Sequence, residues 1–229
     1  MHKAPLFSLL PALCLCLSGC SSVSVYQSAK TLPKGMVQAG LGLGAGKAGD
    51  KKRIPGFHAD LPSVSGDIWA RRGFTDRVDA GLKLSAFGSL TADSRYGLLN
   101  EARGDKWSLA AGLSFVYTDI STGSGADKDT TEIRDLLVPV YISKDLAPWF
   151  TVYGTPRYGR RTTKNTKKTA SSSVSETLNS DMLGLGGGLM FNLGKDARSH
   201  LSFEFQKLAD LSDSSHYVQN AGFAFSSEF

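Results

Sequence analysis

The stretch Val37-Gln38-Ala39-Gly40-Leu41-Gly42-Leu43-Gly44-Ala45 places an apolar residue at every second position. This period of two is that of a β-strand whose two faces meet different surroundings, and turn-rich breaks separate further segments with the same period. Their apolar rows lie within residues 64–70, 80–86, 90–99, 109–117, 136–142, 150–158, 183–193, 201–205 and 217–229. The pattern predicts an all-β, antiparallel protein with about ten strands, within a range of roughly eight to twelve.

The alternation also predicts a membrane setting, because every second residue of a transmembrane β-barrel strand faces lipid and the others face the lumen. In hydrocarbon, the backbone N–H and C=O groups of a sheet are all paired only when the sheet closes on itself and has no edge strands. We therefore expect a closed up-and-down transmembrane β-barrel over residues 35–229. The inward rows carry charges of both signs, at Asp67, Arg71, Asp79, Lys83, Asp93, Arg95, Asp135, Arg157 and Glu204. Such a charge network would offset its own desolvation and fill the lumen, which leaves a narrow pore or none.

The breaks between the segments alternate in length, except that one expected external link, near Gly88, is short. Those at 73–76, 100–106, 144–148 and 194–198 are short, whereas those at 47–61, 121–131 and 160–179 are long. Outer-membrane barrels have short periplasmic turns and longer external loops, so we expect both termini on the periplasmic side and the long breaks outside. Basic residues gather in these predicted loops, at Lys47, Lys51, Lys52, Arg53, Arg160, Arg161, Lys164, Lys167 and Lys168. They could bind lipopolysaccharide phosphates, or simply keep solvated loops polar.

Residues 1–3 are weakly basic and residues 4–17 are almost wholly apolar, a pattern that is typical of a secretory signal. The run ends in Leu17-Ser18-Gly19-Cys20, which resembles the lipobox of bacterial lipoproteins. The resemblance implies removal of residues 1–19, acylation of Cys20 and export to the outer membrane, with residues 20–34 as a lipidated tether on the periplasmic side. Cys14 and Cys16 would leave with the signal peptide, so the mature chain would have no free thiol.

The C-terminus carries a second resemblance. The alternating Phe223, Phe225 and Phe229 resemble the terminal assembly signal of outer-membrane barrels, although Ser227 stands where an aromatic residue is usual. The run 72–81 resembles a strand-turn-strand unit of such barrels. Together with the lipobox, these resemblances imply an outer-membrane β-barrel lipoprotein that meets outer-membrane lipids and the barrel-assembly and lipoprotein-sorting machineries. They are compatible with a structural role or with a narrow pore for small solutes.

Two other functions are compatible with the same residues. A soluble, lipid-anchored barrel similar to lipocalins would bind an apolar ligand and would keep its apolar rows inside. A barrel enzyme acting on lipid A or on peptides would need a base and a nucleophile, for which His200 or His216 with Glu204 and a serine are candidates. The residues show neither the omptin pattern nor that of lipid-A-modifying enzymes, so we expect no catalysis. It also shows no metal-ligand spacing, so we expect no metal or cofactor, and a net charge of +5 alone does not support nucleic-acid binding.

Overall fold

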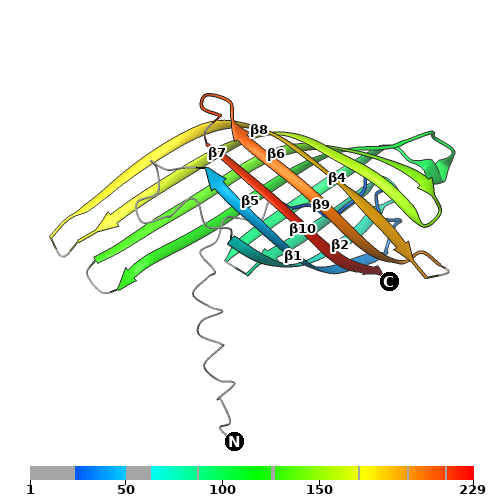
Figure 1. Ribbon diagram of the computed structural model, residues 1–229, viewed down its shortest axis with the longest axis horizontal. Coiled ribbons are helices and arrows are strands. Elements are labelled where there is room, and N and C mark those ends of the chain that lie inside the picture. The colour runs from blue at the N-terminus through cyan, green and yellow to red at the C-terminus, as the bar shows by residue number, and fades with distance from the viewer. Residues whose placement is uncertain are drawn as a thin grey trace, which may run out of the picture.

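The computed structural model describes residues 24–49, 63–86, 88–124, 127–169, 171–194, 196–214 and 216–229. The predicted signal peptide, Cys20, and the basic residues Lys51, Lys52 and Arg53 lie outside the described residues. Ten strands form one closed antiparallel barrel, in which sequence neighbours pair with each other and β1 pairs with β10 (Figure 1). The prediction of an all-β, closed up-and-down barrel is therefore confirmed.

The strands are β1 (Val37–Gly49), β2 (Ser63–Thr75), β3 (Val78–Ser85), β4 (Ser89–Leu99), β5 (Ser108–Ser124), β6 (Asp127–Ala147), β7 (Phe150–Lys168), β8 (Ser173–Leu193), β9 (Ser199–Asp210) and β10 (Tyr217–Glu228). One turn of 3-10 helix, η2 (Glu101–Arg103), lies between β4 and β5. In the described part of the chain, no helix is long and apolar enough to cross a membrane.

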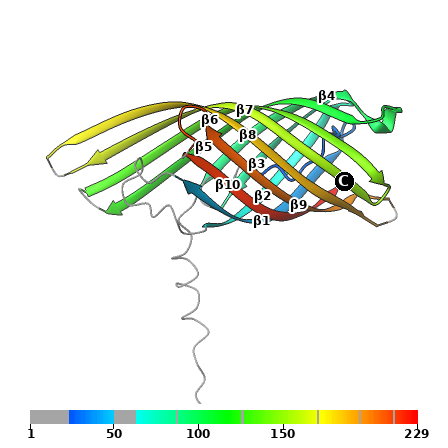
Figure 2. The ribbon, with the colours of Figure 1, turned by 45° about the horizontal axis from the view of Figure 1, so that its top comes forward.

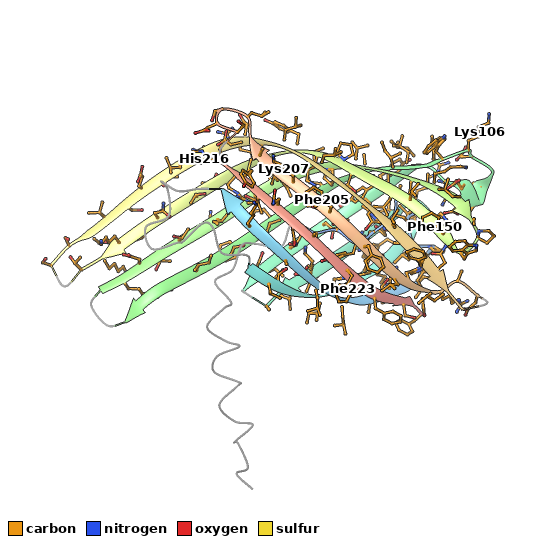
Figure 3. The ribbon with its side chains drawn as sticks, in the orientation of Figure 1. Lys106, Phe150, Phe205, Lys207, His216 and Phe223 are labelled. Carbon is orange, nitrogen blue, oxygen red and sulfur yellow. The ribbon has the colours of Figure 1, made fainter. Side chains whose placement is uncertain are left out.

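The two faces of the barrel wall have opposite character. Leu41, Leu82 and Leu185 point outward, with 63%, 59% and 65% of their surfaces exposed. Figure 3 shows Phe205 and Phe223 on the outer surface of β9 and β10, while charged and polar side chains of the inward rows are buried. A lipocalin-like carrier would need apolar residues inside, so the arrangement opposes that alternative and matches a wall that meets hydrocarbon.

Inward-facing glycines make room for large side chains in the lumen. A Cβ atom at Gly40 would lie 2.5 Å from the ring of Trp69, and a Cβ at Gly188 would lie 2.6 Å from the ring of Tyr153. Both distances are much shorter than van der Waals contact. The barrel can therefore enclose these two aromatic residues only because the opposing strand positions lack a side chain.

The strands extend to different lengths at the two ends of the barrel. One end, termed the short-turn end, carries the turns after β2, β4, β6 and β8, the start of β1 and the end of β10. At the other end, the β5–β6 and β7–β8 hairpins project beyond the remaining strands (Figures 1 and 2). These projecting parts, residues 118–133 and 162–179, are termed the raised hairpins.

The raised hairpins correct the sequence analysis, which predicted loops at 121–131 and 160–179. Instead, β5 continues to Ser124 and β6 starts at Asp127, while β7 continues to Lys168 and β8 starts at Ser173. The hydrophobic alternation stops here because most of the described residues on both faces of the sheet are polar. Threonine residues nevertheless favour the extended backbone, and the strand pairing continues without a break.

Aromatic side chains gather at the short-turn end. The ring of Trp149 lies 5.5 Å from that of Phe150 and 6.3 Å from that of Phe191, measured between centroids. Figure 3 places Phe150 and Lys106 toward this end of the barrel. Aromatic girdles of this kind mark the membrane interfaces of outer-membrane barrels, so the cluster is consistent with one edge of an apolar belt.

Candidate functional site in the barrel lumen

All nine charged side chains that the sequence analysis assigned to the inward rows lie in the lumen. Eight are buried and Asp93 is partly buried, the eight being Asp67, Arg71, Asp79, Lys83, Arg95, Asp135, Arg157 and Glu204. The structure brings some of them together and holds others against different partners.

The largest charge cluster spans β2, β3 and β4. Arg71 donates to Asp79 and to Asp93, and Arg95 donates to the two carboxylate oxygens of Asp79 at 2.9 and 2.7 Å. The strand register causes this, because Asp79 lies opposite Arg95, and Arg71 and Asp93 both lie opposite Gly81. Buried charges are tolerated only when each is paired and hydrogen-bonded, so the cluster acts as one unit.

Asp135 has its partner outside this cluster, whereas Arg157 lines the same small cavity as Arg71 and Asp93. Asp135, at the base of the raised hairpins, accepts two hydrogen bonds of 2.7 Å from Arg161 on the facing strand. Arg157 packs over β8, where a Cβ at Gly184 would lie 3.0 Å from its Cγ. The sequence analysis placed Arg161 in a loop; it lies on β7, together with Arg160, Lys164, Lys167 and Lys168, while Lys47 belongs to β1.

The lumen also contains residues 24–34, which the sequence predicted as a tether leading to the first strand. We term them the lumenal segment. Most of its side chains are buried, those of Ser24, Tyr26, Gln27, Ala29, Thr31 and Leu32. The segment forms neither helix nor strand. Its backbone N–H and C=O groups must therefore find partners on the wall, because unpaired buried backbone groups are costly.

Carboxylates of the wall accept hydrogen bonds from the segment. Glu204 accepts from the backbone N–H of Val25 at 2.8 Å and from that of Tyr26 at 2.6 Å. Asp79 accepts from the backbone N–H of Leu32 at 2.9 Å. Hydrogen bonds to an ionised group are roughly twice as strong as neutral ones, so these carboxylates hold the segment at two levels of the lumen.

Cations of the wall donate to the carbonyl groups of the segment. Arg95 donates to the carbonyl of Ser28 at 2.7 Å and to that of Lys30 at 3.2 Å. Lys83 donates to the carbonyl of Ser24 at 2.6 Å. The sequence analysis treated these lumenal charges as partners of one another, and the structure shows that they also bind a backbone.

Glycines on the wall leave space for the segment. A Cβ at Gly222 would lie 2.2 Å from the hydroxyl of Tyr26, and a Cβ at Gly42 would lie 2.8 Å from its ring. A Cβ at Gly73 would lie 2.1 Å from the carbonyl oxygen of Pro33. Side chains at these three positions would collide with the segment, so the wall is shaped to accommodate it.

Two cavities of different size lie beside the segment in the part of the lumen that the structure describes. A cavity of about 310 Å³ near the short-turn end is lined in part by Lys30, Asp145, His200 and Glu228. A second cavity, lined in part by Lys83 and other wall charges, has a volume of about 50 Å³. Since a water molecule occupies about 30 Å³ of liquid, the second cavity suits only a few waters.

The two histidines considered for catalysis lie in separate surroundings. His200 contacts the side chains of Asn192 and Glu228 at 3.0 and 3.2 Å, and His216 approaches that of Asp213 at 3.5 Å. Glu204, the carboxylate that the catalytic hypothesis requires, instead accepts hydrogen bonds from the backbone of Val25 and Tyr26 and from the hydroxyl of Tyr153. Within the same residues, no group of three or more His, Cys, Asp or Glu side chains could hold a metal ion.

The residues of the predicted assembly signal lie at the closing seam of the barrel. Phe223 and Phe225 point outward from β10. Phe229 follows the strand, and its backbone exchanges hydrogen bonds of 3.1 and 2.8 Å with that of Val37. The terminal residue therefore pairs directly with the first residue of β1.

Comparison with known proteins was informative only for structure. No protein-family model and no curated protein sequence matches this chain. Among solved structures, the translocator domain of the autotransporter NalP from Neisseria meningitidis is similar at 11% identity and a TM-score of 0.51, over 97% of this chain and 94% of that one.

Two further structures cover most of the chain at lower TM-scores. Ail from Yersinia pestis, in complex with the heparin analogue sucrose octasulfate, has 13% identity and a TM-score of 0.48, over 86% of this chain and 99% of Ail. The outer membrane protease OmpT from Escherichia coli has 9% identity and a TM-score of 0.46, over 88% of this chain and 98% of OmpT. At these identities a likeness shows the fold alone: this chain has the fold of outer-membrane β-barrels.

Proposed function

We propose that this protein is an outer-membrane lipoprotein whose barrel is closed by its own lumenal segment and serves as a structural anchor for the raised hairpins. The observation that carries the proposal is the binding of the segment backbone by Glu204, Arg95 and Lys83 inside the lumen. A solute pore needs an open path, whereas the segment crosses this path and leaves a cavity of only about 50 Å³ beside Ser24, Val25 and Gln27. The proposed role is not catalytic.

The energetics favour the closed state. Withdrawal of the segment would remove two backbone donors from Glu204 and two carbonyl acceptors from Arg95. A hydrogen bond to a charged group contributes about 1.5–3 kcal/mol, and its loss in a buried site costs at least as much. Because several such bonds would break together, we expect the open state to be rare.

The raised hairpins supply the surface that the barrel would present. In the outward row of β7, Arg160 follows the exposed Tyr158, and across the sheet Arg134 of β6 lies opposite Thr162. Guanidinium groups just above an apolar belt are suited to bind phosphate groups. We therefore propose lipopolysaccharide phosphates as one partner of this face.

Conductance across planar lipid bilayers tests the closed state. The refolded full-length protein should show no stable open steps, whereas a variant lacking residues 24–34 should show them. Heat-modifiable migration on gels would establish that both proteins are folded. Open steps of equal size in both proteins would contradict a plug formed by the segment.

Lipid attachment is tested separately in a bacterial host. We expect labelled palmitate to enter the wild-type protein and the Cys16→Ala variant, but not the Cys20→Ala variant. Mass spectrometry of the N-terminal peptide would identify the acylated residue. An unacylated N-terminus in the wild-type protein would refute the lipoprotein assignment while leaving the plugged barrel intact.

A further inference from the structure

The lumenal segment has a direction, and one of its ends is at the short-turn end. The backbone N–H of Gly35 donates to the carbonyl of Gly73 at 2.9 Å, and that of Lys34 donates to Asp76 at 3.2 Å. Both partners lie at the end of β2 or in the turn after it. The C-terminal end of the segment is therefore at the same end of the barrel as the start of β1.

The N-terminal end of the segment lies toward the opposite end. Asn220 donates to the hydroxyl of Ser24 at 2.7 Å, and Lys83 donates to the carbonyl of Ser24 at 2.6 Å. Asn220 is the fourth residue of β10, which starts at Tyr217 at the end away from the short turns. Lys83 lies two residues before Ser85, where β3 ends on that same side. Between Lys34 and Ser24, the chain thus runs along the lumen and passes its middle.

The short distance in sequence from Ser24 to Cys20 limits where a lipid on Cys20 can be. Four residues span at most about 14 Å when fully extended. A return to the short-turn end would require this stretch to pass back beside Ser24, Val25 and Gln27, where the cavity in the lumen is only about 50 Å³. The other exit is close, because β3 and β4, with 8 and 11 residues, form a low rim beside the raised hairpins.

We infer that the N-terminus enters the barrel through its external mouth, so that the lipid on Cys20 anchors the protein in the outer leaflet. The inference rests on the proposed lipidation and on the usual placement of short turns in the periplasm. It replaces the expectation of a periplasmic anchor, which assumed that residues 20–34 lead directly to β1. It also implies that the sheet closes around a segment that is already in place, because an acylated end could not pass through the narrow middle of the lumen.

Cysteine accessibility on intact cells tests this topology, since the mature chain is expected to have no other free thiol. Ser22→Cys is the test variant. Ser172→Cys, between β7 and β8, marks the raised end, and Arg103→Cys, in η2, marks the short-turn end. A membrane-impermeant maleimide should label Ser22→Cys and Ser172→Cys on intact cells, and Arg103→Cys only after permeabilisation.

Labelling of Ser22→Cys only after permeabilisation would overturn the inference. If the thiol reacts in neither state, an epitope inserted between Ser22 and Val23 replaces it, and any pattern other than antibody staining of intact cells overturns the inference. External labelling without acylation of Cys20 would refute the lipoprotein assignment alone. Acylation with labelling only after permeabilisation would refute the external anchor alone.

Discussion

The belt of the barrel and the raised hairpins are parts of one continuous sheet, yet their surfaces obey different rules. In the belt, exposed outward residues such as Leu185 are apolar and inward residues such as Glu204 are charged and buried. In the raised hairpins most of the described residues on both faces are polar, and Glu132 forms a partly exposed ion pair with Arg134 at their base. The difference teaches that hydrophobic alternation reports what surrounds a strand, and that strand pairing continues where the surroundings become uniform.

The largest expected effect contrasts two glutamates. Glu204→Ala should reduce the free energy of unfolding by about 3–5 kcal/mol, because the N–H groups of Val25 and Tyr26 lose their acceptor in the lumen. Glu132→Ala, in the raised hairpins, should cost about 0–1 kcal/mol, as for other solvent-accessible ion pairs. Urea unfolding in lipid vesicles measures both. Equal losses would contradict a lumen in which charges hold the segment.

The next effect contrasts two equally exposed apolar residues, Leu185 in the belt at 65% and Val174 in the raised hairpins at 67%. Leu185→Arg should destabilise the protein by about 2–4 kcal/mol, since the side chain would meet hydrocarbon. Val174→Arg should cost less than about 1 kcal/mol, even with Lys167 directly opposite. Urea unfolding in lipid vesicles measures both losses. Similar losses of unfolding free energy in the two variants would mean that the belt does not face lipid.

A smaller effect contrasts two glycines. Gly222→Val should cost about 1–3 kcal/mol, because its Cβ would meet Tyr26 and the backbone of Leu43. Gly66→Val is the matched control, since the atoms nearest its Cβ are 3.8 Å away, and its cost should be within about 0.5 kcal/mol. Increased protease cleavage at the segment in Gly222→Val alone would show that Tyr26 is displaced. Unchanged protection would argue against a wall shaped for the segment.

Much of the fold could be predicted from the residues themselves. The alternation of residues such as Leu41 and Leu43 with glycine determines which face of β1 is apolar, and membrane physics then requires closure. The same period determined that Asp79 and Arg95 point inward. The extent of the raised hairpins could not be predicted in this way, because alternation is absent wherever both faces of a strand are polar.

The course of residues 24–34 was decided only by the tertiary structure. The segment is polar and has no period, so nothing local distinguishes a tether from a plug. Its partners are distant in sequence, as the separation of 179 residues between Val25 and Glu204 shows. The sequence by itself determined a barrel with charges inside. Only the closed fold could bring those charges to one short backbone, because a lumen exists only once the first and last strands have paired.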